Sequence, residues 1–457
     1  MKKLLIISIL GLLLTTSLLT AEGGVEFSGN IETLWGLGAP WTDSETSAGH
    51  FTLGTTNFTS KLDAYYNNSS AYVEASLSYD AVNQQNENSN NAFDLSLNEL
   101  WLDYTESVWG IRIGRQKAAW GKADGIDITN VICPTDMSSL AAMTSDDSKI
   151  AVDAIRLSLS GNQFTADAYW IPFFTPAALP LNQDNSLRKF IVPSSINFPI
   201  SPEQSLTLPV NIGLLDNPDL TIFNGEYGLR ISGYFSAFDL SLYGFYGWDD
   251  TPLLDYTLSY NEAQPPYPPM PKDLSVSGKY ERMSMIGVDA ALPIGATVLR
   301  LESAFFPQRH LQKSAEKIIQ EKMQSSSNVE VSEKHNQLSA LAGIDWMPDG
   351  WTITAQYYCD LVFGNLDNLE RTETYMHGTT LSLSKSLVNE TLELSFSGLL
   401  GLNDFDSMLS PSVKYSISDQ ITFGANAYIF IPGPELDGKY GAYKDLSSFC
   451  INAKFSF

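Results

Sequence analysis

The sequence has 457 residues, is 44% hydrophobic and carries a formal net charge of −25. So acidic a chain is a poor match to nucleic acid, which binds basic surfaces. Its three cysteines show no CxxC or metal-ligand spacing, so we expect no disulfide framework, no metal site and no cofactor.

The first residues resemble a secretory signal peptide. Lys2 and Lys3 precede a short apolar stretch over 4–19, and Ala21 supplies a small residue before a polar segment. A transmembrane anchor is the alternative, but the apolar stretch is short for a bilayer and no positive charge follows it. We therefore expect a signal peptide over 1–21 and one mature unit over 22–457.

Beyond the signal peptide the chain consists of strand-like runs bounded by turn residues. The eighteen predicted strands are 25–37, 51–66, 71–81, 92–104, 108–116, 150–159, 164–171, 224–235, 238–247, 280–292, 296–306, 337–347, 351–363, 373–384, 391–402, 407–417, 421–431 and 447–457.

The connections between these strands alternate between tight turns and long segments, notably 117–149, 172–223, 248–279 and 307–336. Outer-membrane barrels have short periplasmic turns, long extracellular loops and an even number of strands. The alternation therefore predicts an all-β, antiparallel, up-and-down transmembrane barrel in the bacterial outer membrane. We expect 18 strands, or 16 if weak strands are miscounted, with outer-membrane lipid around them.

Single strands show the two faces that a membrane barrel needs. Apolar residues alternate with polar ones, so Asp239 and Glu393 should point away from lipid. In the run 92–104 the apolar residues switch from one strand face to the other. A bulge near Asn98 and Glu99 would keep them all on the same face. Within the last long connection, 311–323 has apolar residues at helical spacing and predicts a helix.

The last strand ends on an aromatic residue, Phe457, with apolar and polar residues alternating before it. This ending is typical of a barrel whose last strand closes against its first, here 25–37. We expect the barrel-assembly machinery to engage this strand, and truncation at Phe457 to impair assembly before transport.

The segment 111–136 is unusually basic for so acidic a chain. It contains Gly114-Arg115-Gln116, Trp120-Gly121, Asn130 and Pro134-Thr135-Asp136. With further segments in matching order, it is similar to a large family of porin-like bacterial outer-membrane proteins. Those further segments are 227–233, 246–252, 286–295, 298–304, 341–346 and 441–445. The resemblance implies a barrel with a channel or export role, and it fixes no cargo.

Charged residues on polar strand faces are the candidate lining of a pore. Arg112, Arg156, Arg230 and Arg300 fall there with Glu226 and Glu302. Arg115, Lys117 and Lys122 are further candidates for the pore lining or its constriction, because they border a connection expected to fold inward. Rings of opposite charge can select solutes by charge. Lumen salt bridges that brace the wall are an equal alternative. Strict alternation places Arg115 on the lipid face, unless it lies above the apolar band or Gly114 forms a bulge.

These features predict a porin-like channel that passes small solutes. A transporter or export barrel for hydrophobic substrates, and a structural or adhesive surface barrel, are the alternatives. The four histidines lie in or near predicted connections without a nucleophile elbow, so we expect no catalysis. A monomer and a homo-oligomer both fit the sequence.

Overall fold

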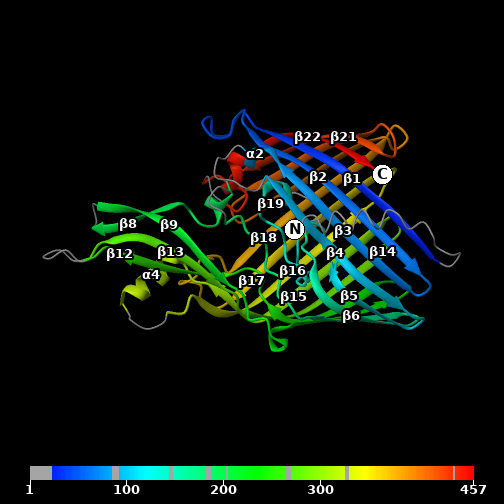
Figure 1. The fold of residues 1–457 in the computed structure, drawn as a ribbon, viewed down its shortest axis with the longest axis horizontal. Coiled ribbons are helices and arrows are strands. Elements are labelled where there is room, and N and C mark those ends of the chain that lie inside the picture. The colour runs from blue at the N-terminus through cyan, green and yellow to red at the C-terminus, as the bar shows by residue number, and fades with distance from the viewer. Residues whose placement is uncertain are drawn as a thin grey trace, which may run out of the picture.

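The computed structural model describes residues 23–84, 92–143, 148–181, 185, 187–201, 204–262, 269–324, 329–435 and 438–457 (Figure 1). The expected signal peptide lies outside these residues. The barrel strands are β1 (Gly23–Gly38), β2 (Phe51–Tyr66), β3 (Ser69–Asp80), β4 (Phe93–Thr105), β5 (Trp109–Gln116), β6 (Val152–Ser160), β7 (Phe164–Ile171), β10 (Glu226–Tyr234), β11 (Asp239–Trp248), β14 (Arg282–Ile294), β15 (Thr297–Gln312), β16 (Ser332–Trp346), β17 (Trp351–Phe363), β18 (Tyr375–Leu387), β19 (Leu392–Gly401), β20 (Ser407–Ser416), β21 (Ile421–Ile431) and β22 (Ser448–Ser456).

These strands form one closed antiparallel sheet of 18 strands. Each strand pairs with its neighbour in the chain or across an external insertion, and β22 pairs with β1 from Asn30–Ser456 to Gly38–Ser448. The predicted 18-stranded barrel and the predicted closure of the last strand on the first are confirmed.

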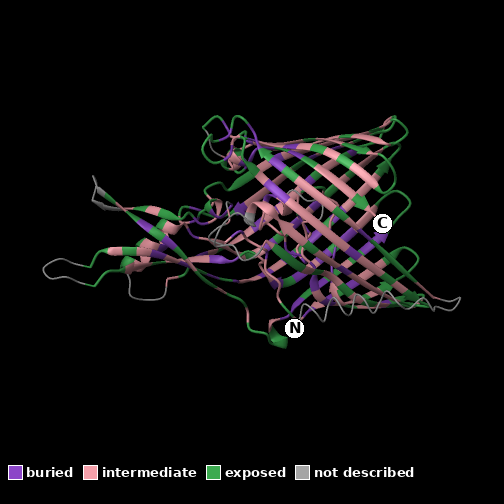
Figure 2. Cartoon of the chain, turned by 45° about the horizontal axis from the view of Figure 1, so that its top comes forward, coloured by how far each residue is buried: buried purple, intermediate pink, exposed green. Residues whose placement is uncertain are grey.

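The outer face of the barrel is apolar. Figure 2 shows exposed and buried positions along the barrel strands. On β11, Leu242 is 52% exposed while its neighbour Ser241 is 5% exposed and points inward. The same alternation places Asp239 on the inner face, as predicted, because it shares the side of Ser241. Within the described residues, no helix has the length and apolar character to cross a bilayer.

The phase change in β4 is a bulge. Glu74 pairs with Glu99 and Ala75 pairs with Leu97, so Asn98 is the extra residue. The Asn98 side chain accepts a hydrogen bond from Ser76 (3.0 Å) and donates one to Glu74 (3.1 Å). The predicted bulge is confirmed, and it keeps apolar residues outward on both sides of it.

The chain end completes the seam between first and last strands. The backbone N–H and C=O of Phe457 both pair with Gly29, at 3.0 Å each. Its ring lies 5.7 Å from the ring of Phe27 and 6.2 Å from that of Phe58. The last residue is therefore held by the first two strands.

A second sheet lies outside the barrel, where the sequence predicted only connections. It has the order β12 (Leu253–Tyr260), β13 (Pro271–Lys279), β9 (Gln204–Asp216), β8 (Ser195–Ser201), and it projects beyond one end of the barrel (Figure 1). Its central pair, β13 and β9, is parallel. It joins the connection between β7 and β10 to the connection between β11 and β14, and the sequence of either connection alone does not indicate this pairing. We call these strands the external sheet.

Short helices complete the fold. The predicted helix is present as α4 (Ala315–Gln324), but it begins later than expected because β15 extends through Gln312. The others are α2 (Ala81–Gln84), α3 (Leu140–Met143), η1 (Arg188–Phe190), η2 (Ile222–Asn224) and η3 (Gly441–Leu446).

Candidate functional site

After β5 the chain leaves the wall and folds inside the barrel as residues 117–136, here called the inner loop. Gln116, the last residue of β5, is buried, and its side chain donates to the backbone carbonyl of Ala154 on β6 (2.9 Å). Gly114 has φ = 128°, a conformation open to glycine, just before this departure.

One side of the inner loop packs against inward residues of the wall. Trp120 lies 5.1 Å from Tyr243 and 6.1 Å from Tyr169, ring to ring. A Cβ at Gly228 would come within 3.1 Å of the Trp120 ring, so the loop packs tightly against β10 at this glycine. Burial raises the pKa of the Cys133 thiol in this cluster to about 11, which makes it a neutral packing group.

Glu302 on β15 is the main polar attachment of the inner loop. Its carboxylate is 3% exposed and accepts hydrogen bonds from the N–H groups of Lys122 (2.6 Å), Ala123 (2.8 Å) and Thr129 (2.8 Å). The Thr129 hydroxyl donates a fourth, also at 2.8 Å. Gly121 has φ = 82°, and a Cβ there would collide with this carboxylate.

Gln356 on β17 extends this attachment along the wall, two strands beyond Glu302 on β15. Its side-chain amide donates to the carbonyl of Asp124 (2.6 Å) and accepts from the Asp124 N–H (2.9 Å). The side chain thus satisfies both backbone groups of Asp124, as a neighbouring strand would in a sheet. The same amide reaches Thr380 on β18 at 2.7 Å. The inner loop therefore reaches from β5 to β17 on the lumen side.

Two predicted arginines also hold the loop backbone. Arg230 donates to the carbonyl of Ala119 (3.2 Å), and Arg300 donates to that of Lys122 (2.9 Å). Together with Glu302, these contacts dock the inner loop on the wall formed by β10 to β17.

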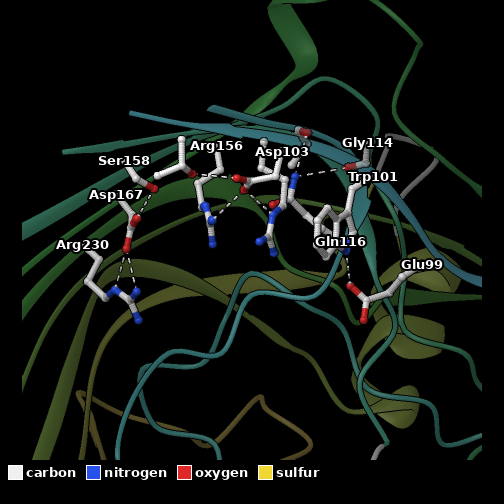
Figure 3. A network of polar contacts seen from close by, with 12 residues as sticks. Glu99, Trp101, Asp103, Gly114, Gln116, Arg156, Ser158, Asp167 and Arg230 are labelled. Atoms are coloured by element: carbon white, nitrogen blue, oxygen red, sulfur yellow. Dashed lines mark hydrogen bonds and ion pairs between the residues drawn. The ribbon is translucent and has the colours of Figure 1, made fainter. Parts of the chain in front are cut away.

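The arginines predicted on the inner face have acidic partners (Figure 3). Arg112 forms an ion pair with Asp103 at 2.9 Å and lies over the Trp101 ring at 3.7 Å. Arg156 approaches the same Asp103 carboxylate at 3.5 Å. The Asp103 carboxylate on β4 therefore forms ion pairs with one arginine on β5 and one on β6.

The same pairing continues along the wall. Arg230 pairs with Asp167 at 2.6 Å, and Arg300 pairs with Asp345. The Lys122 ammonium lies 3.9 Å from Asp289, which also accepts a hydrogen bond from Tyr243. The inward arginines thus form a ladder of ion pairs with wall carboxylates, which is the arrangement expected from the salt-bridge alternative.

Arg115 does not join this ladder. It shares the outward face of β5 with Ile113, pairs with Asp153 at 3.2 Å and donates to the carbonyl of Leu97 beside the β4 bulge (3.1 Å). Neither pairing of β5 shifts register, so alternation keeps it outside the lumen.

The remaining two predicted residues lie near strand ends. The Lys117 N–H donates to Glu99 at 3.1 Å where the inner loop begins. Glu226, at the start of β10, is buried and accepts the N–H of Trp248 at 2.9 Å. Glu226 shares the inner face of β10 with Arg230 but is only 4% exposed.

Acidic residues without cationic partners lie elsewhere on the inner face. Glu26 and Asp63 stand directly opposite each other on β1 and β2, and Asp239 begins β11. In the part of the chain that the structure describes, none of the three forms an ion pair. Uncompensated charge in the lumen is therefore negative at these positions.

The wall next to the docked half is lined differently. Its inward positions on β18 to β20 include a row of small hydroxyl residues of intermediate exposure, bordered by the facing residues Glu393 and Lys414. Within this row Ser395 and Ser412 are 2.6 Å apart through their oxygens. This row consists of Ser382, Ser384, Ser395, Ser397, Ser410 and Ser412. It carries hydrogen-bonding groups without charge or bulk.

The sequence identified the arginines but missed their partners. Asp103, Asp167, Asp289 and Asp345 lie on the same polar faces, and alternation alone would have placed them inward. Gln356 had no such signal, because an inward glutamine is an ordinary lumen residue until the loop is known to reach it.

A family model places the chain among known sequences. The model for DUF1302, described as a protein of unknown function, matches residues 43–430. The chain belongs to this family. The porin-like family resemblance of the motifs is thereby confirmed, whereas a comparison with curated proteins found no match.

Solved outer-membrane structures match nearly the whole chain. OccAB3 of Acinetobacter baumannii has a TM-score of 0.50 at 10% identity, covering 96% of this chain and 100% of its own. OccK8 (OprE) of Pseudomonas aeruginosa has a TM-score of 0.49 at 10% identity, covering 95% and 97%. The outer membrane channel DcaP of A. baumannii has a TM-score of 0.43 at 9% identity, covering 96% and 99%. With its closed sheet and apolar outer face, the chain is an outer-membrane β-barrel.

Proposed function

We propose that this DUF1302 protein is a porin-like channel for small solutes, narrowed by its inner loop. The observation that carries the proposal is the one-sided docking of residues 117–136 on Glu302 and Gln356. Barrels of 16–18 strands are wide enough for an aqueous channel. A loop docked on one wall reduces that width, and the uncharged serine row supplies a polar path along the other.

The charge pattern supports a preference for cations and neutral solutes over anions. The inward arginines are neutralised by Asp103, Asp167 and Asp345, whereas Glu26 and Asp63 have no cationic partner in the described chain. Fixed charge that remains uncompensated attracts the opposite ion into a narrow lumen.

Planar-bilayer recording tests both the channel and its preference for cations. The purified barrel should give discrete conductance steps, and a KCl gradient should give a reversal potential that corresponds to a K⁺/Cl⁻ permeability ratio above one. Absence of conductance from folded protein would contradict a channel. Steps with a ratio below one would keep the channel and reject the cation preference.

A further inference from the structure

The connection between β9 and β10 carries an exposed apolar tip, residues 220–223. Leu220 is 79% exposed, Ile222 68% and Phe223 84%. Such a cluster on a short turn has no packing role within the described residues. Exposed apolar groups gathered in this way mark a surface that meets lipid or protein.

The backbone of the tip is tied to the barrel rim. Arg282, the first residue of β14, donates to the carbonyls of Gly225 (3.0 Å) and Phe223 (3.2 Å). The indole N–H of Trp248, the last residue of β11, donates to the carbonyl of Asn224 (2.9 Å). The tip is therefore held in a defined position where β10, β11 and β14 reach the rim.

These rim residues belong to the lipid-facing side of the barrel. Tyr227 and Tyr246 are 48% and 50% exposed on the outer face, and alternation places Trp248 and Arg282 on the same face. The Arg282 guanidinium lies 4.0 Å from the Trp248 ring centre. Aromatic residues with an arginine at a strand end are typical of the membrane–water interface.

We propose that residues 220–223 insert into the outer leaflet of the membrane as a second, non-barrel anchor. The tip is continuous with the aromatic rim, so lipid is the partner that already surrounds its attachment points. Apolar side chains below an interfacial arginine and tryptophan bury apolar area in the acyl region. Because β9 leads into the tip, this anchor would also fix the base of the external sheet, which projects beyond the end of the barrel (Figure 1).

Depth-dependent fluorescence quenching tests this proposal. Phe223→Cys and Leu214→Cys, each in a Cys359→Ala background, would carry an environment-sensitive fluorophore in phosphatidylcholine vesicles. Leu214 is the matched control, because it is also 84% exposed but lies on β9 in the external sheet. The other two native cysteines, Cys133 and Cys450, are buried.

Lipids brominated in their acyl chains should quench the label at position 223 several-fold more than the label at 214. Equal, weak quenching at both positions would overturn the proposal. Weak quenching at 223 together with cross-linking of two chains through that cysteine would assign the tip to a second copy instead. Both labelled proteins should retain the heat-modifiable migration of a folded barrel. Weak quenching at position 223 can then not be attributed to unfolded protein.

Discussion

The two halves of the barrel wall use polar residues in opposite ways. The docked half, β10 to β17, carries charged residues that pair with one another or hold the inner loop, centred on Glu302. The bare half, β18 to β22 with β1 and β2, is the part of the wall on which the inner loop does not dock. It carries the serine row, acidic residues without ion-pair partners in the described chain (Glu26 and Asp63) and the closure at Phe457. Charge on the docked half therefore fixes a loop in place, and we propose that solute passes along the bare half.

Removing Phe457 should have the largest effect, because it opens the seam of the bare half. The deletion loses two backbone hydrogen bonds to Gly29 and ring contacts with Phe27 and Phe58, each aromatic pair adding about 0.5–1.5 kcal/mol. The fraction migrating as folded barrel on unheated gels should fall strongly. Phe457→Tyr keeps the ring and should assemble; normal yield of the deletion would contradict the role of the seam.

Glu302→Ala should release the inner loop from the docked half. Four donors lose their acceptor, and hydrogen bonds to a charged group contribute about 1.5–3 kcal/mol each. Single-channel conductance should rise and become noisier while the barrel still assembles. Glu393→Gln on the bare half is the control and should leave conductance near that of the native chain. Unchanged conductance of folded Glu302→Ala would mean that the loop does not limit the lumen.

Asp103→Asn should have a smaller effect, on selectivity alone. It leaves Arg112 and Arg156 without their shared carboxylate, so two positive charges face the lumen. The K⁺/Cl⁻ permeability ratio from reversal potentials should fall. Asp153→Asn makes the same chemical change on the outer face, beside Arg115, and should leave the ratio unaltered. Equal shifts in both variants would argue against a lumen-specific field.

The barrel could be predicted from the sequence because its rules are local. Alternation set the strand faces, turn residues set the order, and the switch of apolar residues between faces in β4 revealed its bulge. Arg115, a predicted pore-lining residue, lies instead on the outer face. The external sheet was missed because β9 and β13 pair in parallel across two separate connections. Nothing in either segment alone signals that pairing.

The candidate site was only partly predictable. Basic residues in an acidic chain drew attention to Arg112, Arg230 and Arg300, but whether an arginine is free or paired depends on the register of neighbouring strands. The contact between Gln356 and Asp124 joins residues 232 positions apart, and only the path of the inner loop brings them together.

Our central proposal is that solute passes beside the serine row, on the part of the wall where the inner loop does not dock. Thiol modification of Ser395→Cys by a small cationic methanethiosulfonate, recorded in open single channels, tests it most directly. Ser395 faces inward and its neighbour Leu394 faces lipid at 44% exposure, so Leu394→Cys is the matched control. We predict a stepwise loss of current in Ser395→Cys and none in Leu394→Cys or the native chain. Unchanged current in fully modified Ser395→Cys would contradict the account.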